Sequence, residues 1–356
     1  MPWRRWLDVS RREGTAPLLE RHLRTRPDCV PAPVRTELRR IRLAAAARHL
    51  RAVEIVGPVL RAAHAAGLRI GISKGFHWAE RLYPEPGLRP YLDVDLFVRP
   101  AEWRAFLSLL QRAGFRPEIG TITVVSGGKA SAWAFSPVFR KDGLAVELHP
   151  NPFGLQIPSA TGDAFWDALR EVPFAGGMAF APPWPYEFCI AAVHAQQHSY
   201  RRLSWLVDLA EMAGRTDLDW AATSRLARRE GIEPVLAHGL RIASLCWPGC
   251  IPEGRERLFP AGRWARRGAR FFWPEEAAAS RRPLPEAPYY MPSIFALARR
   301  GSPLGMARGV VRIFFPPAGW VRRQIPSAGG FRRLGYFVRR LVRPWIFLVE
   351  RRLSGR

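Results

Sequence analysis

Two short segments that are far apart in the chain share a pattern that constrains the fold strongly. They are 91–98 (YLDVDLFV) and 144–149 (LAVELH). In a β-strand, residues i and i+2 point to the same face of the sheet. Asp93 and Asp95 therefore share one face of the first strand, and Glu147 and His149 share one face of the second. We expect a sheet with one apolar face and one face that carries carboxylates.

The neighbouring segments predict a small mixed sheet with helices. Residues 67–73 alternate as a strand does, the Lys74-Gly75 pair forms a turn, and the apolar spacing over 76–83 predicts a helix. Gly-Gly and Asp-Gly pairs, which favour hairpin turns, separate the later strand candidates. The full expected order is a helix at 35–66, strands at 67–73 and 91–98, a helix at 101–114, strands at 121–126, 130–135 and 144–149, and helices at 185–200, 203–212, 220–229 and 234–245.

These elements and the length of 356 residues predict an α+β protein of about two domains. We expect an N-terminal basic helical segment over 1–66 and a small mixed-sheet α/β domain over 67–157. A helical domain follows over 158–258, where strand signals fade and helical periodicity begins. Residues 259–356 form a basic C-terminal extension rich in Pro and aromatic residues.

The net charge of +25 is concentrated at the two ends of the chain. Residues 1–70 hold 15 Lys and Arg against 6 Asp and Glu, and residues 261–356 hold 20 against 4, whereas residues 71–260 hold 20 of each. The positive field is thus a property of the flanking segments rather than of the centre.

Residues 331–352 alternate arginine pairs with aromatic and aliphatic residues. Three interpretations stay open: arginine stems packed over the helical domain, a helix on an anionic membrane surface, or an RNA-binding segment. No RNA-binding motif is recognisable, so nucleic acid is the least favoured partner. No apolar stretch reaches the roughly 18 residues that a membrane-spanning helix needs.

The first residues are charged, without the apolar run of roughly 7 to 15 residues that marks a secretory signal. The four cysteines lack the paired spacings of zinc sites and are interpreted as reduced thiols. We therefore expect a cytoplasmic protein, peripheral to the membrane if the C-terminal segment binds lipid.

The paired carboxylates indicate a metal site. Asp93 and Asp95 lie side by side in an otherwise apolar strand, so they repel each other, and burying them without a cation is costly. Glu147 on a neighbouring strand would supply a third carboxylate. We predict that these three residues bind Mg²⁺ or Mn²⁺; the alternative is an ordinary pair of strand-end aspartates.

The strand-to-helix turn at Ser73, Lys74 and Gly75 suits phosphate. A glycine lets backbone N–H groups approach an anion, the helix N-terminus adds its dipole, and Lys74 supplies a full charge. Arg89, just before the aspartate strand, is a further candidate for binding phosphate. The alternative is a glycine needed only for the turn, a lysine in solvent and a surface arginine.

Two histidines, His194 and His198, share one face of a helix, and Asp208 could orient either ring. A zinc site would need a third ligand, and the HExxH motif is absent from the sequence. We expect this pair, with His149, either to line a cleft near a base or an acceptor or to pack between helices.

The run KGFHWAERLYPEPGLRPYLDVDLFVRPAEWRAFLSLLQRAGF resembles an uncharacterised nucleotidyltransferase family, itself similar to the polymerase-beta-type superfamily. The shared pattern is a Lys-Gly turn, then an arginine, then Asp-hydrophobic-Asp-hydrophobic. The resemblance continues through VELHP, where Glu147 matches the third carboxylate, and through HAQQHSYRRLSWLVDLAEMA. It covers about residues 35 to 250, with a looser likeness to about residue 345. Superfamily enzymes usually carry a Gly-Ser turn before the first aspartate, whereas this chain has Lys74-Gly75 preceded by Ser73.

The resemblance implies that 67–157 is a catalytic domain that moves a nucleoside monophosphate from a nucleoside triphosphate to an acceptor hydroxyl. The acceptor would be a small molecule, a peptide or a protein. Two magnesium ions would be held by Asp93, Asp95 and Glu147, and Ser73, Lys74, Gly75 and Arg89 would bind the nucleotide. The departure at the turn supports an alternative, a non-catalytic accessory protein that binds a nucleotide or peptide and associates with a membrane surface or RNA.

Overall fold

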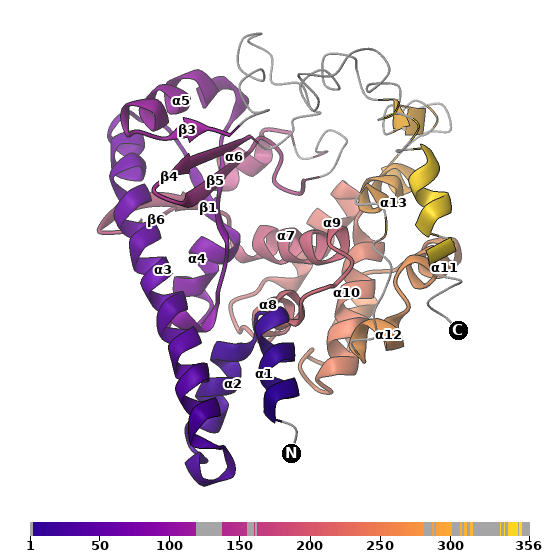
Figure 1. Ribbon diagram of the computed structural model, residues 1–356. Coiled ribbons are helices and arrows are strands. Elements are labelled where there is room, and N and C mark those ends of the chain that lie inside the picture. The colour runs from indigo at the N-terminus through magenta and orange to yellow at the C-terminus, as the bar shows by residue number, and fades with distance from the viewer. Residues whose placement is uncertain are drawn as a thin grey trace.

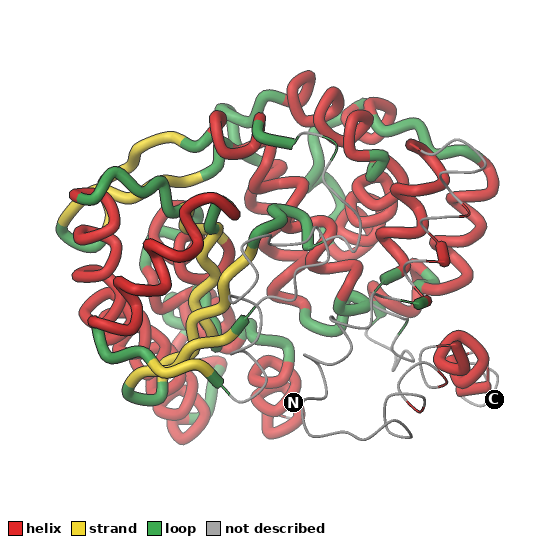
Figure 2. Tube along the Cα trace, turned by 90° about the horizontal axis from the view of Figure 1, so that it is seen from above, coloured by secondary structure: helices red, strands yellow, loops and turns green. Residues whose placement is uncertain are grey.

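The computed structural model describes residues 3–118, 137–154, 160, 162–280, 287, 290–300 and separate positions between 307 and 350. A sheet with helices packed on it forms one half of the molecule, and the other half is helical (Figures 1 and 2). The expected α+β class is confirmed. The strands expected at 121–126 and 130–135 lie outside the described residues.

The sheet has seven strands in the order β3-β4-β5-β2-β1-β7-β6. Their bounds are β1 Gly71–Ser73, β2 Asp93–Phe97, β3 Arg116–Pro117, β4 Val138–Lys141, β5 Leu144–His149, β6 Arg170–Phe174 and β7 Gly177–Ala181. Strand β2 runs parallel to β5 and antiparallel to β1, and the register places Asp95 between Glu147 on β5 and Ser73 on β1. The two segments that carry the acidic pattern are therefore adjacent at the centre of the sheet.

The hairpin β6–β7 is a part of the sheet that the sequence pattern did not indicate. Strand β7 pairs parallel with β1, so residues 170–181 belong to the sheet, and the expectation of a helical region over 158–258 is wrong for this hairpin. Strand β6 lies at the sheet edge and is largely solvent-exposed, so it lacks the apolar alternation of a half-buried strand. Its turn uses Ala175 and Gly176 in the left-handed region.

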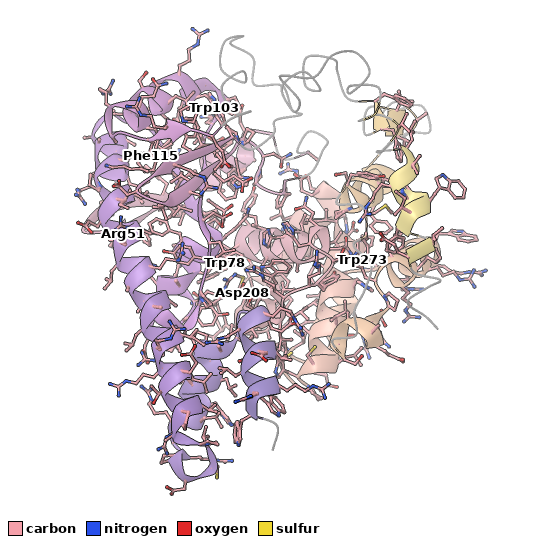
Figure 3. The ribbon with its side chains drawn as sticks, viewed as in Figure 1. Arg51, Trp78, Trp103, Phe115, Asp208 and Trp273 are labelled. Carbon is pink, nitrogen blue, oxygen red and sulfur yellow. The ribbon has the colours of Figure 1, made fainter. Side chains whose placement is uncertain are left out.

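One face of the sheet packs against the helices α3 (Ala32–Ala65) and α5 (Trp103–Arg112). Helix α3 runs along the whole of that side of the molecule (Figure 1). The apolar residues that alternate with the acidic ones belong to this core, as do Trp103 and Phe115, which Figure 3 labels. They include Val94, Leu96, Val146 and Leu148. The opposite face of β2 and β5 carries the carboxylates, as predicted.

The second half is a group of helices around a separate core. Its members are α7 (Trp184–Gln197), α8 (Leu203–Ala213), α9 (Trp220–Glu230), α10 (Glu233–Cys246), α11 (Arg263–Phe272), α12 (Glu275–Ala279) and α13 (Met291–Arg300). Trp273, labelled in Figure 3, is fully buried there. Trp78 and Phe97 of the sheet half belong to the same core, so the two halves share packed side chains.

Four more α-helices lie in the described part of the chain: α1 (Trp3–Arg12), α2 (Ala16–Leu23), α4 (Lys74–Arg81) and α6 (Ala164–Ala168). Helices α2 and α1 pack against α3, and α4 contacts both the sheet and α7. Helix α1 lies beside α8 (Figure 1), where the backbone N–H of Leu203 donates to Glu13 Oε2 at 3.0 Å. Within the described part of the chain, we find no helix both long and apolar enough to cross a membrane.

Candidate active site

A cavity of about 1090 Å³ lies between the carboxylate face of the sheet and helices α7 and α8. Most of the residues singled out from the sequence line it, and the two exceptions are Ser73 and Asp208. Those that line it are Lys74, Gly75, Arg89, Asp93, Asp95, Glu147, His149, His194 and His198. The fold thus gathers residues from 74 to 198 around one space.

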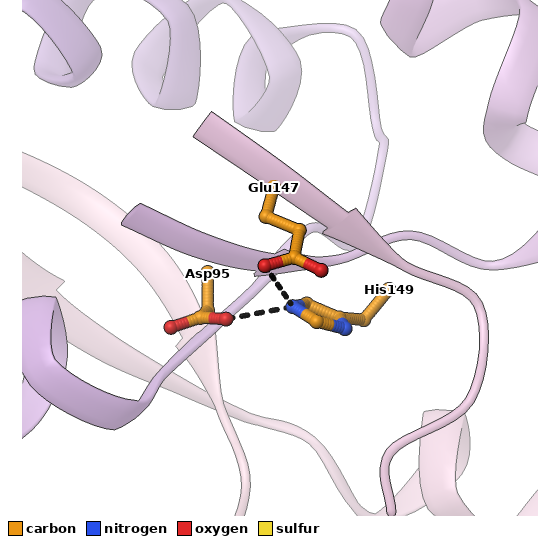
Figure 4. Close-up of side chains that lie close together, drawn as sticks. All are labelled: Asp95, Glu147 and His149. Atoms are coloured by element: carbon orange, nitrogen blue, oxygen red, sulfur yellow. Dashed lines mark hydrogen bonds and ion pairs between the residues drawn. The ribbon is translucent and has the colours of Figure 1, made fainter. Parts of the chain in front are cut away.

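Three side chains of β2 and β5 form a compact cluster in this cavity (Figure 4). One donor atom each of Asp95, Glu147 and His149 lies within 4.8 Å of the others. His149 Nε2 is 2.7 Å from Asp95 Oδ1 and 3.9 Å from Glu147 Oε2. The parallel register of β2 and β5 produces this proximity, because it pairs Asp95 with Glu147 directly.

Asp93 lies two residues before Asp95 on the same face of β2, outside the compact cluster. Burial, and then the negative charges of Asp95 and Glu147, raise the pKa of Asp93 to about 6. Burial alone would also raise the pKa of Asp95, but the Lys74 ammonium and the His149 ring hold it well below its usual range. The negative charge of Asp95 is therefore balanced by neighbouring groups, whereas ionisation of Asp93 remains unfavourable.

Lys74 is a buried cation directed at the carboxylates. Its Nζ donates to Asp95 Oδ1 at 2.7 Å and lies 3.4 Å from His149 Nε2. Burial works to lower the pKa of Lys74, but Asp95, Glu147 and Asp93 together outweigh it and raise the pKa. The side chain is 14% exposed, so the alternative of a lysine in solvent is wrong.

Gly75 is required for close packing. A Cβ atom there would lie 2.4 Å from the Cβ of Tyr91, far inside van der Waals contact. The left-handed conformation of the turn falls on Lys74, at φ 53°, and not on the glycine. Tyr91 on the loop before β2 therefore fixes how close the Lys74-Gly75 turn lies to the aspartate strand.

Ser73 contacts a residue that the sequence analysis missed. Its hydroxyl donates to Glu187 of α7, whose carboxylate also lies 3.0 Å from His77 Nδ1 and accepts from Trp78 Nε1 at 3.0 Å. Glu187 is fully buried. An acidic residue within an otherwise apolar helix was the available signal. Ser73 thus fixes the turn to the helical half and does not face the cavity.

Arg89 and Asp208 form a buried ion pair. Arg89 Nε and Nη2 donate to the two Asp208 carboxylate oxygens at 2.7 Å each, and Nη1 donates to the Pro90 carbonyl. Tyr83 also donates to Asp208, at 2.7 Å. The expectation that Asp208 orients a histidine is wrong, because its carboxylate binds Arg89 and Tyr83. Each guanidinium nitrogen of Arg89 has an acceptor within the protein, so the arginine is not a surface residue.

Aromatic rings form the wall of the cavity on the α7 and α8 side. The ring centroids of His194 and His198 are 4.6 Å apart, and both lie just over 5 Å from that of Trp205. Burial, and then the positive charges of Lys74 and His198, lower the pKa of His194 well below its usual value. At neutral pH this wall presents a neutral His194 ring.

Comparison with known proteins finds a matching family. The model of a family described as an uncharacterised nucleotidyltransferase matches residues 1–248. Searches of curated proteins and of solved structures find no match. The matched span contains the carboxylate cluster and all helices from α1 to α10.

Proposed function

Since the chain belongs to an uncharacterised nucleotidyltransferase family, we propose that it transfers a nucleoside monophosphate from a nucleoside triphosphate to the hydroxyl of an acceptor. The observation that carries the proposal is the set of Asp93, Asp95, Glu147 and Lys74 in one cavity.

The cavity residues fit a divalent cation. Carboxylate oxygens are the ligands that Mg²⁺ and Mn²⁺ prefer. Burial and the charges of Asp95 and Glu147 raise the pKa of Asp93 despite the opposing effects of Lys74 and His149, so a further cation beside Asp93 would be favourable. Asp93, Asp95 and Glu147 would hold one or two ions, and His149 would orient the Asp95 carboxylate. A bound Mg²⁺ or Mn²⁺ would neutralise phosphate charge and acidify the acceptor hydroxyl.

The protein's own residues would supply position, charge and proton transfer. The acceptor oxygen bonds to the α-phosphorus while the bond to the pyrophosphate oxygen breaks, and pyrophosphate leaves. Glu147 takes the hydroxyl proton, since it is the least buried member of the compact cluster. Lys74 contributes a fixed positive charge, and the rigid pairing of β2 with β5 keeps the reacting groups in place.

Calorimetric titration of each nucleoside triphosphate with Mg²⁺ tests this function. The wild type should bind one or more of them only with metal present, and Asp95→Asn should lose that binding. Asp28→Asn, at an exposed position away from the cavity, is the matched control and should bind as the wild type does. A wild type that binds no triphosphate under any metal condition would contradict the proposal.

A specific observation favours a second candidate, a non-catalytic nucleotide-binding protein. Two of the four residues expected to bind the nucleotide, Ser73 and Arg89, are bound within the protein to Glu187 and Asp208. Pyrophosphate release from the bound triphosphate distinguishes the two functions. Metal-dependent binding without any pyrophosphate release, with or without candidate acceptors, would favour the non-catalytic protein.

A further inference from the structure

The phosphate groups of a bound nucleotide need cationic partners that the expected residues do not supply. Ser73 and Arg89 are bound within the protein, and Lys74 is held against Asp95. The other arginines that line the cavity are Arg12, Arg201 and Arg202. We propose that Arg12 and Arg202 form the binding site for the triphosphate tail, a site that rests on the proposed function.

Helix α1 is fixed so that Arg12 faces the cavity. Glu13, the next residue, is buried and accepts from the Leu203 N–H, and the Ser204 N–H donates to the Glu13 carbonyl at 3.1 Å. Gly14 has a φ of 72°, and a Cβ there would lie 2.9 Å from Ser204 Oγ. These contacts hold the end of α1 against the start of α8, and Arg12 and Arg202, which precede the contacting residues, both line the cavity.

The Arg12 side chain retains its capacity to bind an anion. It is 69% exposed, and its Nε lies 3.5 Å from Glu13 Oε1, a long contact for an ion pair. The Glu13 carboxylate already accepts the Leu203 N–H. A guanidinium with this exposure can offer two parallel N–H groups to a phosphate.

Arg201 and Arg202 follow an unusual backbone turn between α7 and α8. Ser199 and Tyr200 are successive non-glycine residues with φ of 54° and 51°. Left-handed conformations of such residues are costly and persist where the surroundings hold them. Here Tyr200 is buried in the helical core, and Ser199 Oγ accepts from the Ala287 N–H at 3.0 Å. The turn places every residue from Gln197 to Arg202 at the cavity wall.

The cavity therefore has two chemically distinct sides. The sheet side carries Asp93, Asp95 and Glu147, and the α1 and α8 side carries the three arginines beside Trp205. The Arg202 guanidinium lies 5.9 Å from the Trp205 ring centroid. In a nucleoside triphosphate, the α-phosphate would meet the carboxylates and their metal, and the β- and γ-phosphates would meet Arg12 and Arg202. An anionic group of the acceptor has the same chemistry, so the test must separate the two sources.

The test uses the full chain with two double variants. Arg12→Gln/Arg202→Gln removes the charges, and Arg12→Lys/Arg202→Lys keeps them but removes the paired N–H geometry. Arg225→Gln/Arg229→Gln, at exposed positions of α9 away from the cavity, is the matched control. Thermal melts establish that each variant folds. Titrations with Mg²⁺ and the nucleoside triphosphate, nucleoside monophosphate and inorganic tripolyphosphate give the affinities.

We expect the glutamine variant to bind triphosphate and tripolyphosphate about 10- to 100-fold more weakly, from charge-assisted hydrogen bonds lost at two arginines. Its affinity for the monophosphate should stay within about twofold of the wild-type value. The triphosphate affinity of the lysine variant should lie between those of the wild type and the glutamine variant. Triphosphate affinity equal to the wild type would overturn this inference and leave the proposed function standing. A wild type that binds no triphosphate would overturn the proposed function as well.

Discussion

Replacing Asp93 by Asn should stabilise the metal-free protein at pH 8, an unusual outcome for a substitution in a cavity. The folded-state pKa of Asp93 is about 6 against an ordinary value of 3.8, because burial and the neighbouring carboxylates disfavour its charged form. A raised carboxyl pKa means that stability is fully present below pH 3.8 and is lost as the pH rises through 6. The asparagine cannot ionise and escapes this loss.

The size of the effect follows from the shift. About two pKa units at roughly 1.4 kcal/mol each give an upper value of about 3 kcal/mol at pH 8. Asp93 is partly exposed, so solvent screening reduces this to about 1–3 kcal/mol. For a chain of this length, unfolding entropy of about 2.1 cal/mol/K per residue converts 2 kcal/mol to a Tm increase of about 3 °C. At pH 4.5 the difference should be less than half as large.

Thermal and urea melts in EDTA between pH 4.5 and 8 measure this difference, with Asp28→Asn as the control at an exposed site. Adding Mg²⁺ should reverse the order, because the wild type gains binding free energy that the variant lacks. A variant less stable than the wild type at pH 8, or a stability difference that does not change with pH, would refute the assignment of an uncompensated charge to Asp93.

Three further predictions concern the packing around the site and the C-terminal segment. Asp208→Asn should lower the free energy of unfolding in urea melts by about 3–5 kcal/mol, because Arg89 would stay buried without its charged partner. A decrease below about 1 kcal/mol would show that the fold does not need this ion pair. Gly75→Ala should cost about 1–3 kcal/mol through overlap with Tyr91 and lower Tm by about 1–4 °C, whereas Gly262→Ala, where an added Cβ has no atom within 4 Å, should change Tm little. If residues 331–352 bind an anionic membrane surface, the chain should sediment with phosphatidylserine vesicles and not with phosphatidylcholine vesicles, and equal sedimentation with both would count against that interpretation.

The elements that the sequence predicts well are those whose pattern depends on local periodicity. Strand β5 and the helices α7 to α10 form close to the predicted residues, because apolar residues recur along each of them and a Pro or Gly lies near one or both of its ends. The β6–β7 hairpin was missed because an edge strand with exposed residues needs no apolar alternation. Its place beside β1 is decided by pairing across more than 100 residues, which local periodicity does not encode.

The site residues also divide into those that local periodicity predicts and those whose place depends on contacts with distant parts of the chain. Asp95 and Glu147 could be predicted because the strand period fixes which face each side chain occupies, and the parallel register then pairs them. His149 was expected in the cleft, and its contact with Asp95 depends on that register. Glu187 could not be assigned from the sequence, because its three partners come from the β1–α4 region more than 100 residues away.

The buried acids of the helical half show that it does more than cover the cavity. Glu187 holds the turn that carries Lys74, and Asp208 holds Arg89 on the loop that leads into β2. Each contact joins the segments around the aspartate strand to α7 or α8, so a boundary near residue 157 would cut through the structure that positions the carboxylates. Glu13, Glu187 and Asp208 all lie within residues 1–248, the span of the family match. We therefore expect that the whole of this span, with α1 included, is needed to form the site.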